Sequence, residues 1–233
     1  MFNSNFDLEG HFEERESIFT VLSPEELKEL EKARQVIRCR RNEIIYKEGD
    51  TPTGMVYLHE GKVKIYKEGV GGREQIIRMV KSRGLVGFRS LLAGENHISS
   101  AVALEESIVH CIPEDFLFNT LLKNNNFSLH LLQNLAQELG FSNKRTISLT
   151  QKHIRGRLAE SLLLLRDKYG FENDNATLKV YLSREDIANL SNMTTSNAIR
   201  TLSTFANEKV IAIDGRKIRL IDVEALEKIS MLG

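Results

Sequence analysis

The stretch that decides the fold is LSREDIANLSNMTTSNAIRTLSTFAN, residues 182–207. Ser183 and Asp186 form the S-x-x-D pattern of a helix start, in which the hydroxyl caps an unpaired backbone N–H. Asn192 stands in a short polar turn and tolerates the left-handed conformation that such a turn needs. Thr194 then suits the N-cap of a second helix, whose apolar residues recur every three or four positions. The stretch therefore predicts two short helices joined by a tight turn.

The predicted second helix carries a small polar face with a single arginine. Hydroxyl and amide groups can hydrogen-bond to base edges in the major groove of DNA, and an arginine can bridge the acceptors of guanine or contact a phosphate. An ordinary surface pair of helices would show the same pattern, so this stretch by itself leaves both interpretations open. The candidate DNA-contacting residues are Thr194, Thr195, Ser196, Asn197 and Arg200.

The residues that follow favour the DNA interpretation. Two strand patterns, residues 210–213 and 216–220, flank an Asp-Gly turn, which is the signature of a β-hairpin. A hairpin directly after a recognition helix is a winged helix. We expect Arg216 and Lys217, at the tip of this wing, to contact the phosphate backbone.

The composition indicates a cytosolic protein with ordinary hydrophobic cores. Apolar residues make up 41% of the 233-residue chain. The chain contains no run of about 18 apolar residues, which a membrane span would need. The N-terminal stretch is polar and acidic, unlike a signal peptide. Cys39 and Cys111 are too few for a four-thiolate iron–sulfur cluster or a zinc finger. The 32 basic and 32 acidic residues balance, so DNA binding would rest on locally basic elements.

The N-terminal half changes its period along the chain. Residues 12–30 read as helix, and residues 35–112 read as many short strands separated by glycine turns. This spacing predicts a compact antiparallel roll or barrel. The period returns to helical in residues 127–152.

That long helical segment carries a row of positions typical of a coiled-coil seam: Leu129, Leu132, Ala136, Leu139 and Asn143. We expect the seam to pair with a second copy of the chain, making a homodimer. The alternative is a single helix packed on its own roll.

The predicted fold class is α+β. Residues 1–125 form an effector-sensing antiparallel β-roll of the double-stranded β-helix or jelly-roll type, with flanking helices. Residues 126–153 form the dimerisation helix, and residues 154–233 form a winged helix-turn-helix that binds DNA.

This order of elements resembles the CRP/FNR family of bacterial transcription regulators, and the resemblance covers nearly the whole chain. Its supporting motifs are residues 46–50 with 56–64, the glycines of residues 84–87, Pro113 with Phe116, and residues 182–220. By that resemblance the roll senses a small molecule. Two winged helices of a dimer then read the half-sites of a pseudo-palindromic operator, about one helical turn apart, and RNA polymerase is the further partner.

The effector pocket implied by the resemblance departs from the pattern of cyclic-nucleotide-binding members. Those members carry Glu directly after the glycine that corresponds to Gly87, whereas this chain has Phe88 there. At the position of the Arg that pairs with their cyclic phosphate, this chain has His97 or Ile98. Losing that arginine costs a charge-assisted pair worth about 1.5–3 kcal/mol, so cyclic AMP is not expected in the usual mode. The candidate pocket residues are Gly87, Phe88, His97, Ile98, Ser99, Ser142 and Asn143, although Ser142 and Asn143 also suit an ordinary helix surface.

The recognition helix departs as well. Thr195, Ser196 and Arg200 stand where family members often carry Arg or Val, then Glu, then Arg. Ser196 cannot reproduce the acceptor that Glu offers to cytosine, so the operator should differ at that base while Arg200 keeps its guanine contact.

Other function classes find less support in the motifs. Heme is a less favoured effector, because the four candidate histidines (His59, His97, His110 and His130) show no paired ligand spacing. A barrel enzyme would want a metal-binding H-x-H cluster, a phosphate loop or a nucleophile elbow, and none is present, so no enzyme activity, catalytic residue or metal site is expected. A roll-domain signalling protein that binds a protein partner stays as the alternative.

Overall fold

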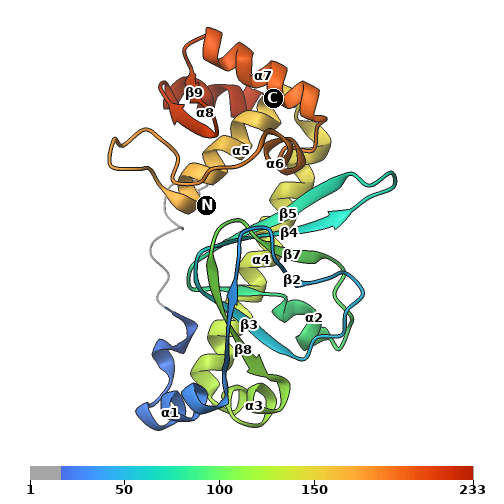
Figure 1. Cartoon of the computed structure of the whole chain (residues 1–233), viewed down its shortest axis with the longest axis vertical. Coiled ribbons are helices and arrows are strands. Elements are labelled where there is room, and N and C mark those ends of the chain that lie inside the picture. The colour runs from blue at the N-terminus through green and yellow to red at the C-terminus, as the bar shows by residue number, and fades with distance from the viewer. Residues whose placement is uncertain (1–16, 233) are drawn as a thin grey trace, which may run out of the picture.

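The computed structural model describes residues 17–232 (Figure 1). Its N-terminal part opens with a 3-10 turn and a helix, followed by eight strands that enclose one short helix. These elements are η1 (Ile18–Val21), α1 (Pro24–Ala33), β1 (Gln35–Cys39), β2 (Ile44–Tyr46), β3 (Gly54–Glu60), β4 (Lys62–Glu68), β5 (Glu74–Lys81), β6 (Gly84–Val86), α2 (Phe88–Ala93), β7 (Ser100–Ala103) and β8 (Ser107–Pro113).

The strands form two four-stranded antiparallel sheets, in the orders β1-β8-β3-β6 and β2-β7-β4-β5. Side chains alternate between the two faces of each strand. Leu58 and Val109 therefore point into the roll and meet Val63 and Ala101 from the other sheet. The predicted antiparallel roll over residues 35–112 is confirmed. The roll is residues 35–113 from here on.

Helices cover the outer face of the first sheet. Met55, Tyr57 and Ile112 pack there under apolar residues of the elements that flank the roll. One of these elements, α1, starts at a capping box, because Ser23 accepts from the N–H of Glu26 while the Glu26 carboxylate accepts from the N–H of Ser23. The predicted helical segment 12–30 is thus split into η1 and α1, and residues 12–16 lie outside the described residues.

The second half of the chain is mostly helical. It consists of α3 (Glu114–Asn119), η2 (Leu121–Lys123), α4 (Asn125–Gln151), α5 (Ile154–Tyr169), α6 (Arg184–Leu190), α7 (Thr195–Asn207), β9 (Ile211–Asp214), β10 (Lys217–Leu220) and α8 (Val223–Leu232). α4 runs from the lower end of the roll to the upper unit, as Figure 1 shows. Lys152 and His153 are extended, which separates α4 from α5.

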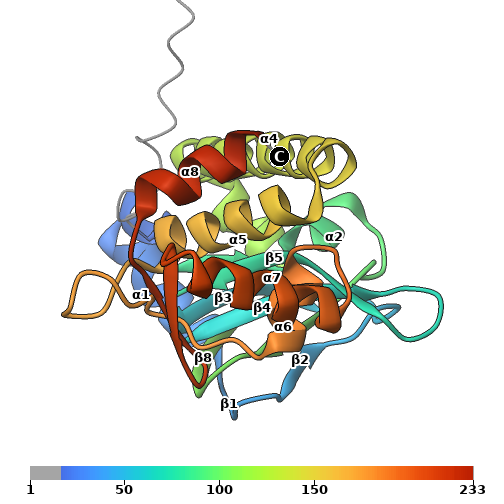
Figure 2. The same cartoon turned by 90° about the horizontal axis from the view of Figure 1, so that it is seen from above.

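Residues 154–232, from α5 to α8, pack around one core and are called the winged-helix unit. Seen from above, this unit lies over the strands of the roll (Figure 2). Among the described residues, no helix is both long and apolar enough to cross a membrane.

The segment 177–182 alternates apolar and polar side chains as a strand would, but it is not part of any of the strands named above. It forms isolated bridges, at Thr177 with Arg219 and at Leu178 with Phe171. Its apolar alternation arises because Leu178, Val180 and Leu182 reach the core from an extended chain that lacks a neighbouring ladder.

Candidate DNA-binding surface and effector region

The two short helices of residues 182–207 are present with the predicted caps. Ser183 Oγ accepts from the N–H of Asp186, and the Asp186 carboxylate accepts from the N–H of Ser183, which completes a capping box for α6. Asn192 in the turn has a φ of 49°, as predicted from its tolerance of left-handed backbone. Met193, beside it, is buried in the core. The turn is therefore fixed both by backbone geometry and by an apolar anchor.

Helix α7 presents the predicted polar residues to solvent. Thr194 caps the helix, since its hydroxyl accepts from the N–H of Asn197 at 3.2 Å. Thr195, Ser196 and Arg200 are exposed. Asn197 is half-buried, and its Oδ1 accepts from the Arg200 guanidinium. The opposite face of α7 fills the core with Ala198, Leu202 and Phe205.

The wing forms with its tip shifted by one residue from the predicted turn. Asp214 pairs with Lys217, so Gly215 and Arg216 make the turn, and Gly215 has a φ of 54°. Both Arg216 and Lys217 are exposed. Arg184, at the start of α6, donates to the Gly215 carbonyl at 2.7 Å. The helix-turn-helix thus holds the wing tip in place, a contact that sequence patterns did not indicate.

The hairpin of strands β4 and β5, called the docking hairpin, fastens the roll to the winged-helix unit. Lys64 Nζ lies 2.8 Å from Asp186 Oδ1, and Gln75 Nε2 donates to the Asn189 carbonyl at 2.8 Å. At its tip, Arg73 donates to Asn192 Oδ1 at 2.8 Å. These three contacts fall along one face of α6 and its turn.

Apolar packing and charge reinforce this contact. Ile76 and Met79 of the docking hairpin belong to the winged-helix core. Burial opposes the charged form of Lys64, but hydrogen bonds to Asp186 and Glu74 raise its pKa overall. Burial likewise works against ionised Asp186, yet Lys64 and Ser183 lower the pKa of that carboxyl. Both groups of the central ion pair are therefore charged at neutral pH.

Arg157 of α5 also contacts the turn of the helix-turn-helix. Its guanidinium donates to the Leu149 carbonyl at 3.3 Å and to the Asn192 carbonyl at 3.1 Å. The turn residue Asn192 is thus bonded both to Arg157 of α5 and to Arg73 of the docking hairpin. These contacts orient α7 so that it lies on the far side of the unit from the roll (Figure 1).

The predicted effector region is only partly brought together. Gly87, with a φ of 69°, is the N-cap residue of α2 and lies against the aromatic rings of Tyr46 and His97. These rings stack with centroids 3.8 Å apart, and a Cβ at Gly87 would come within 2.8 Å of Tyr46. Burial raises the pKa of Tyr46 to about 12 and lowers the pKa of His97. Both rings are therefore uncharged at neutral pH in the region where the resemblance places a cyclic phosphate.

The other predicted pocket residues take different positions. Ser99 is buried, and it lies close enough to Tyr46 to oppose the rise in the pKa of that phenol. Phe88 is buried in the apolar cluster outside the roll that contains Met55 and Leu85, and Ile98 is 53% exposed. Ser142 and Asn143 are exposed on α4. Gly87, His97 and Ser99 thus gather around Tyr46, a residue that the sequence reasoning did not select.

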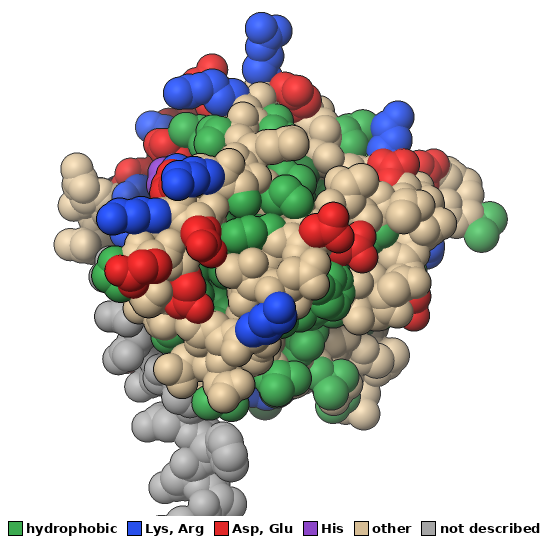
Figure 3. Space-filling model, turned by 90° about the horizontal axis from the view of Figure 1, so that it is seen from below, with side chains coloured by type: hydrophobic (Ala, Val, Ile, Leu, Met, Phe, Trp, Pro, Cys, Tyr) green, Lys and Arg blue, Asp and Glu red, His purple; other side chains and the backbone are tan. Residues whose placement is uncertain are grey.

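Helix α4 has two apolar faces. One packs on the roll through Phe127 and Leu131. The other is open, because Leu129, Leu132 and Leu139 are 53%, 62% and 63% exposed. Figure 3 views the lower end of the molecule, where apolar side chains lie uncovered between charged ones.

Metal binding finds no support in the part of the chain that the structure describes, since no three His, Cys, Asp or Glu side chains gather there. Cys39 is buried and Cys111 half-buried, and both are free thiols.

Two family models match the chain. The model "Cyclic nucleotide-binding domain" matches residues 36–124, and the model "Crp-like helix-turn-helix domain" matches residues 156–229. The transcriptional regulatory protein btr of Bordetella pertussis is 32% identical over 211 residues, which cover 88% of this chain and 84% of that protein.

Further relatives agree. The CRP-like cAMP-activated global transcriptional regulator of Mycobacterium tuberculosis is 26% identical over 215 residues, covering 92% of this chain and 96% of that protein. The solved structure of FixK2 from Bradyrhizobium japonicum shares the fold, with a TM-score of 0.75 at 22% identity, over 84% of this chain and 96% of that one. The named relatives are regulators and not enzymes. A relative 32% identical over most of both chains, together with the two family models, shows that this protein belongs to the CRP/FNR family of DNA-binding transcription regulators.

Proposed function

We propose that the protein is a homodimeric, cytosolic regulator that reads a pseudo-palindromic operator with α7 and contacts the flanking backbone with its wing. The observation that carries the proposal is the polar face of α7, which is exposed and lies on the far side of the winged-helix unit from the roll. Thr195, Ser196 and Arg200 reach the base edges, and Asn197 holds the Arg200 guanidinium. Thr194 caps the helix at the point where its N-terminus approaches a phosphate.

Arg216 and Lys217 serve affinity and not base choice. Both are exposed, positively charged side chains at the wing tip, and such side chains suit contacts to phosphate oxygens. Arg184 supports them indirectly by holding the Gly215 carbonyl. Replacing either wing-tip cation by a neutral residue should flatten the salt dependence of DNA binding by about one unit of slope.

The dimer forms through α4. Its exposed leucines repeat at coiled-coil spacing on the face that the roll leaves free. A twin helix would bury this seam and set the two winged-helix units side by side, so that two half-sites about one helical turn apart are read together. In this arrangement residues 1–125 sense the effector, residues 126–153 dimerise, and residues 154–233 bind DNA and face RNA polymerase.

The effector is not a cyclic nucleotide bound in the usual mode. The space beside Gly87 is taken by the uncharged Tyr46–His97 stack, which cannot neutralise a cyclic phosphate. Phe88 lies in an apolar cluster and offers no acceptor to a ribose hydroxyl. The aromatic stack instead favours an effector with a flat, weakly charged surface that could replace one ring.

The test is an unbiased selection of genomic DNA fragments by the purified full chain, with and without cyclic AMP or heme. We expect enrichment of a palindromic motif that does not depend on cyclic AMP. Enrichment of no motif under any condition, with binding to a protein partner, would instead support a signalling protein without a DNA target. Enrichment strictly dependent on cyclic AMP would refute the proposed role of the aromatic stack.

A further inference from the structure

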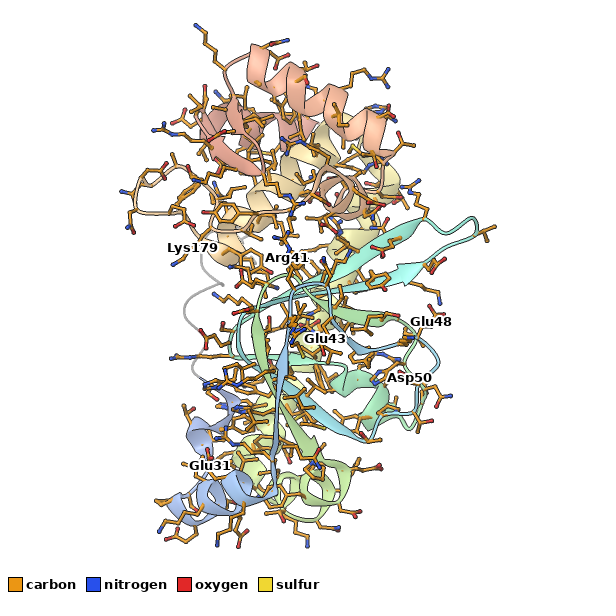
Figure 4. All side chains as sticks on the ribbon, in the orientation of Figure 1. Glu31, Arg41, Glu43, Glu48, Asp50 and Lys179 are labelled. Atoms are coloured by element: carbon orange, nitrogen blue, oxygen red, sulfur yellow. The ribbon has the colours of Figure 1, made fainter. Side chains whose placement is uncertain are left out.

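A cavity of about 420 Å³ opens where the roll meets the winged-helix unit. It lies at the opposite end of the docking hairpin from the tip that holds the helix-turn-helix. Its charged lining comes from both sides of the junction: Lys62, Lys81 and Glu105 from the roll, and Asp167, Lys168 and Lys179 from the winged-helix unit. Figure 4 labels Lys179 at the level of this junction.

The cavity has more basic than acidic side chains, and its carboxylates are already engaged. Lys62 Nζ donates to both oxygens of Glu105, at 2.9 and 2.8 Å. Asp167 Oδ1 accepts from Arg166 Nε at 2.7 Å, and Arg166 lies outside the cavity lining. The carboxylates of Glu105 and Asp167 therefore pair with cations other than Lys81 and Lys179.

Lys81 and Lys179 are left without an anionic neighbour of their own. Lys81 is half-buried at the end of β5, and Lys179 follows the bridge at Leu178. Across residues 17–232, neither side chain takes part in an ion pair or a side-chain hydrogen bond. Both residues line the same cavity, and like charges beside a partly enclosed space repel each other more strongly than they would in open water. An anion in that space would remove the repulsion.

We propose that this junction cavity binds a small phosphate-bearing anion through Lys81 of the roll and Lys179 of the winged-helix unit. Its cations are lysines, which act as compact point charges and can bind phosphate oxygens from any direction. Its volume falls within the range of about 300–1,000 Å³ typical of small-molecule sites. The cavity shares no lining residue with the predicted effector region around Gly87, so it is a separate site.

Such an anion would bridge two units that otherwise meet through the docking hairpin. Because it would contact both, it binds the docked arrangement better than an undocked one and stabilises it by mass action. By linkage, any ligand that favours the docked arrangement would raise the affinity for the anion by the same factor.

The experiment titrates inorganic pyrophosphate into the full chain by calorimetry, at an ionic strength held constant with sodium chloride. We expect saturable binding, and a loss of affinity of about tenfold or more in each of Lys81→Gln and Lys179→Gln. These changes remove no partner from any other group, so the variants should melt at the wild-type temperature. Pyrophosphate should raise the Tm of the wild type and leave that of the double variant unchanged.

Two matched controls remove equal charge elsewhere. Lys28→Gln with Lys47→Gln changes two exposed lysines far from the cavity, and Arg216→Gln with Lys217→Gln changes the wing tip. Both should keep the wild-type affinity for pyrophosphate. Equal weakening in the first control, or loss of binding in the second, would overturn the site by showing diffuse attraction or binding at the DNA surface.

Citrate separates phosphate from carboxylate chemistry. It should bind at least tenfold more weakly than pyrophosphate. Citrate that binds as tightly would overturn the phosphate class, and the absence of saturable pyrophosphate binding would overturn the site altogether. No DNA is present in these measurements, so their failure is distinguishable from a failure of the proposed DNA-binding function.

Discussion

Lys64 of β4 lies 2.8 Å from Asp186 of α6, and the two side chains are only 12% and 16% exposed. Asp186 also belongs to the capping box with Ser183, so a single carboxylate completes the cap at the start of α6 and pairs with the roll. The capping box and the docking of the two units are therefore coupled through one residue.

Replacing Lys64 by methionine should destabilise the protein by about 2–3 kcal/mol, because Asp186 and Glu74 both lose their cation while Asp186 keeps its bonds to Ser183. Urea unfolding of the full chain measures this loss. Lys67→Met is the matched control, since its pair with Glu48 is 50% and 41% exposed and should contribute about 1 kcal/mol or less. Equal losses in the two variants would show that the Lys64 pair does not fasten the units.

The pH dependence of stability should carry a term from His110. Burial, then the Arg34 cation and His59, lower its pKa to about 4, whereas an unfolded histidine titrates near about 6.5. Between these pH values the unfolded chain binds a proton at His110 and the folded chain does not. The free energy of unfolding therefore falls as the pH drops from about 6.5 to about 4.

His110→Gln should remove this term. Urea unfolding at about pH 7 and about pH 4.5 should show a smaller acid-induced loss in the variant than in the wild type. The exposed His153→Gln should keep the wild-type loss. An unchanged difference between the two pH values in His110→Gln would mean that the imidazole is protonated in the fold.

Arg200→Ala should cost about 1–3 kcal/mol of specific DNA binding with little change in binding to random DNA. Fluorescence anisotropy on the selected operator and on a shuffled duplex measures both. Arg200→Lys keeps the charge but loses the fork, so it should retain binding to random DNA and lose discrimination. If Arg200→Lys discriminates like the wild type, the residue contacts a phosphate and not a base.

Leu132→Glu combined with Leu139→Glu should turn the dimer into monomers. Each leucine is more than half exposed in the single chain, so the change spares the fold but removes about 1.5–3 kcal/mol of burial per side chain at the seam. Sedimentation equilibrium reports the mass. Gln133→Glu with Gln151→Glu places the same charge on exposed positions of α4 and should remain dimeric, while a dimeric leucine variant would place the interface elsewhere.

Local physics was readable from the sequence. The caps at Ser183 and Thr194, the left-handed Asn192 and the alternation of the roll strands depend on neighbouring residues within a few positions, so the helix-turn-helix, the wing and the roll were predictable. The short strand β6 and the helix α2 that follows were not separated from their surroundings, because each spans too few residues to show a period.

Contacts between distant residues were decided by the tertiary structure alone. Lys64 and Asp186 are 122 positions apart, and no local pattern marks a lysine in an alternating strand as the partner of a helix cap. The same holds for Tyr46, whose ring stacks on that of His97, a residue in the loop before β7. The chain by itself determined which elements form and which faces they bury. Only the packing decided which polar side chains meet, because their pairing depends on how segments that are distant in the sequence pack against each other.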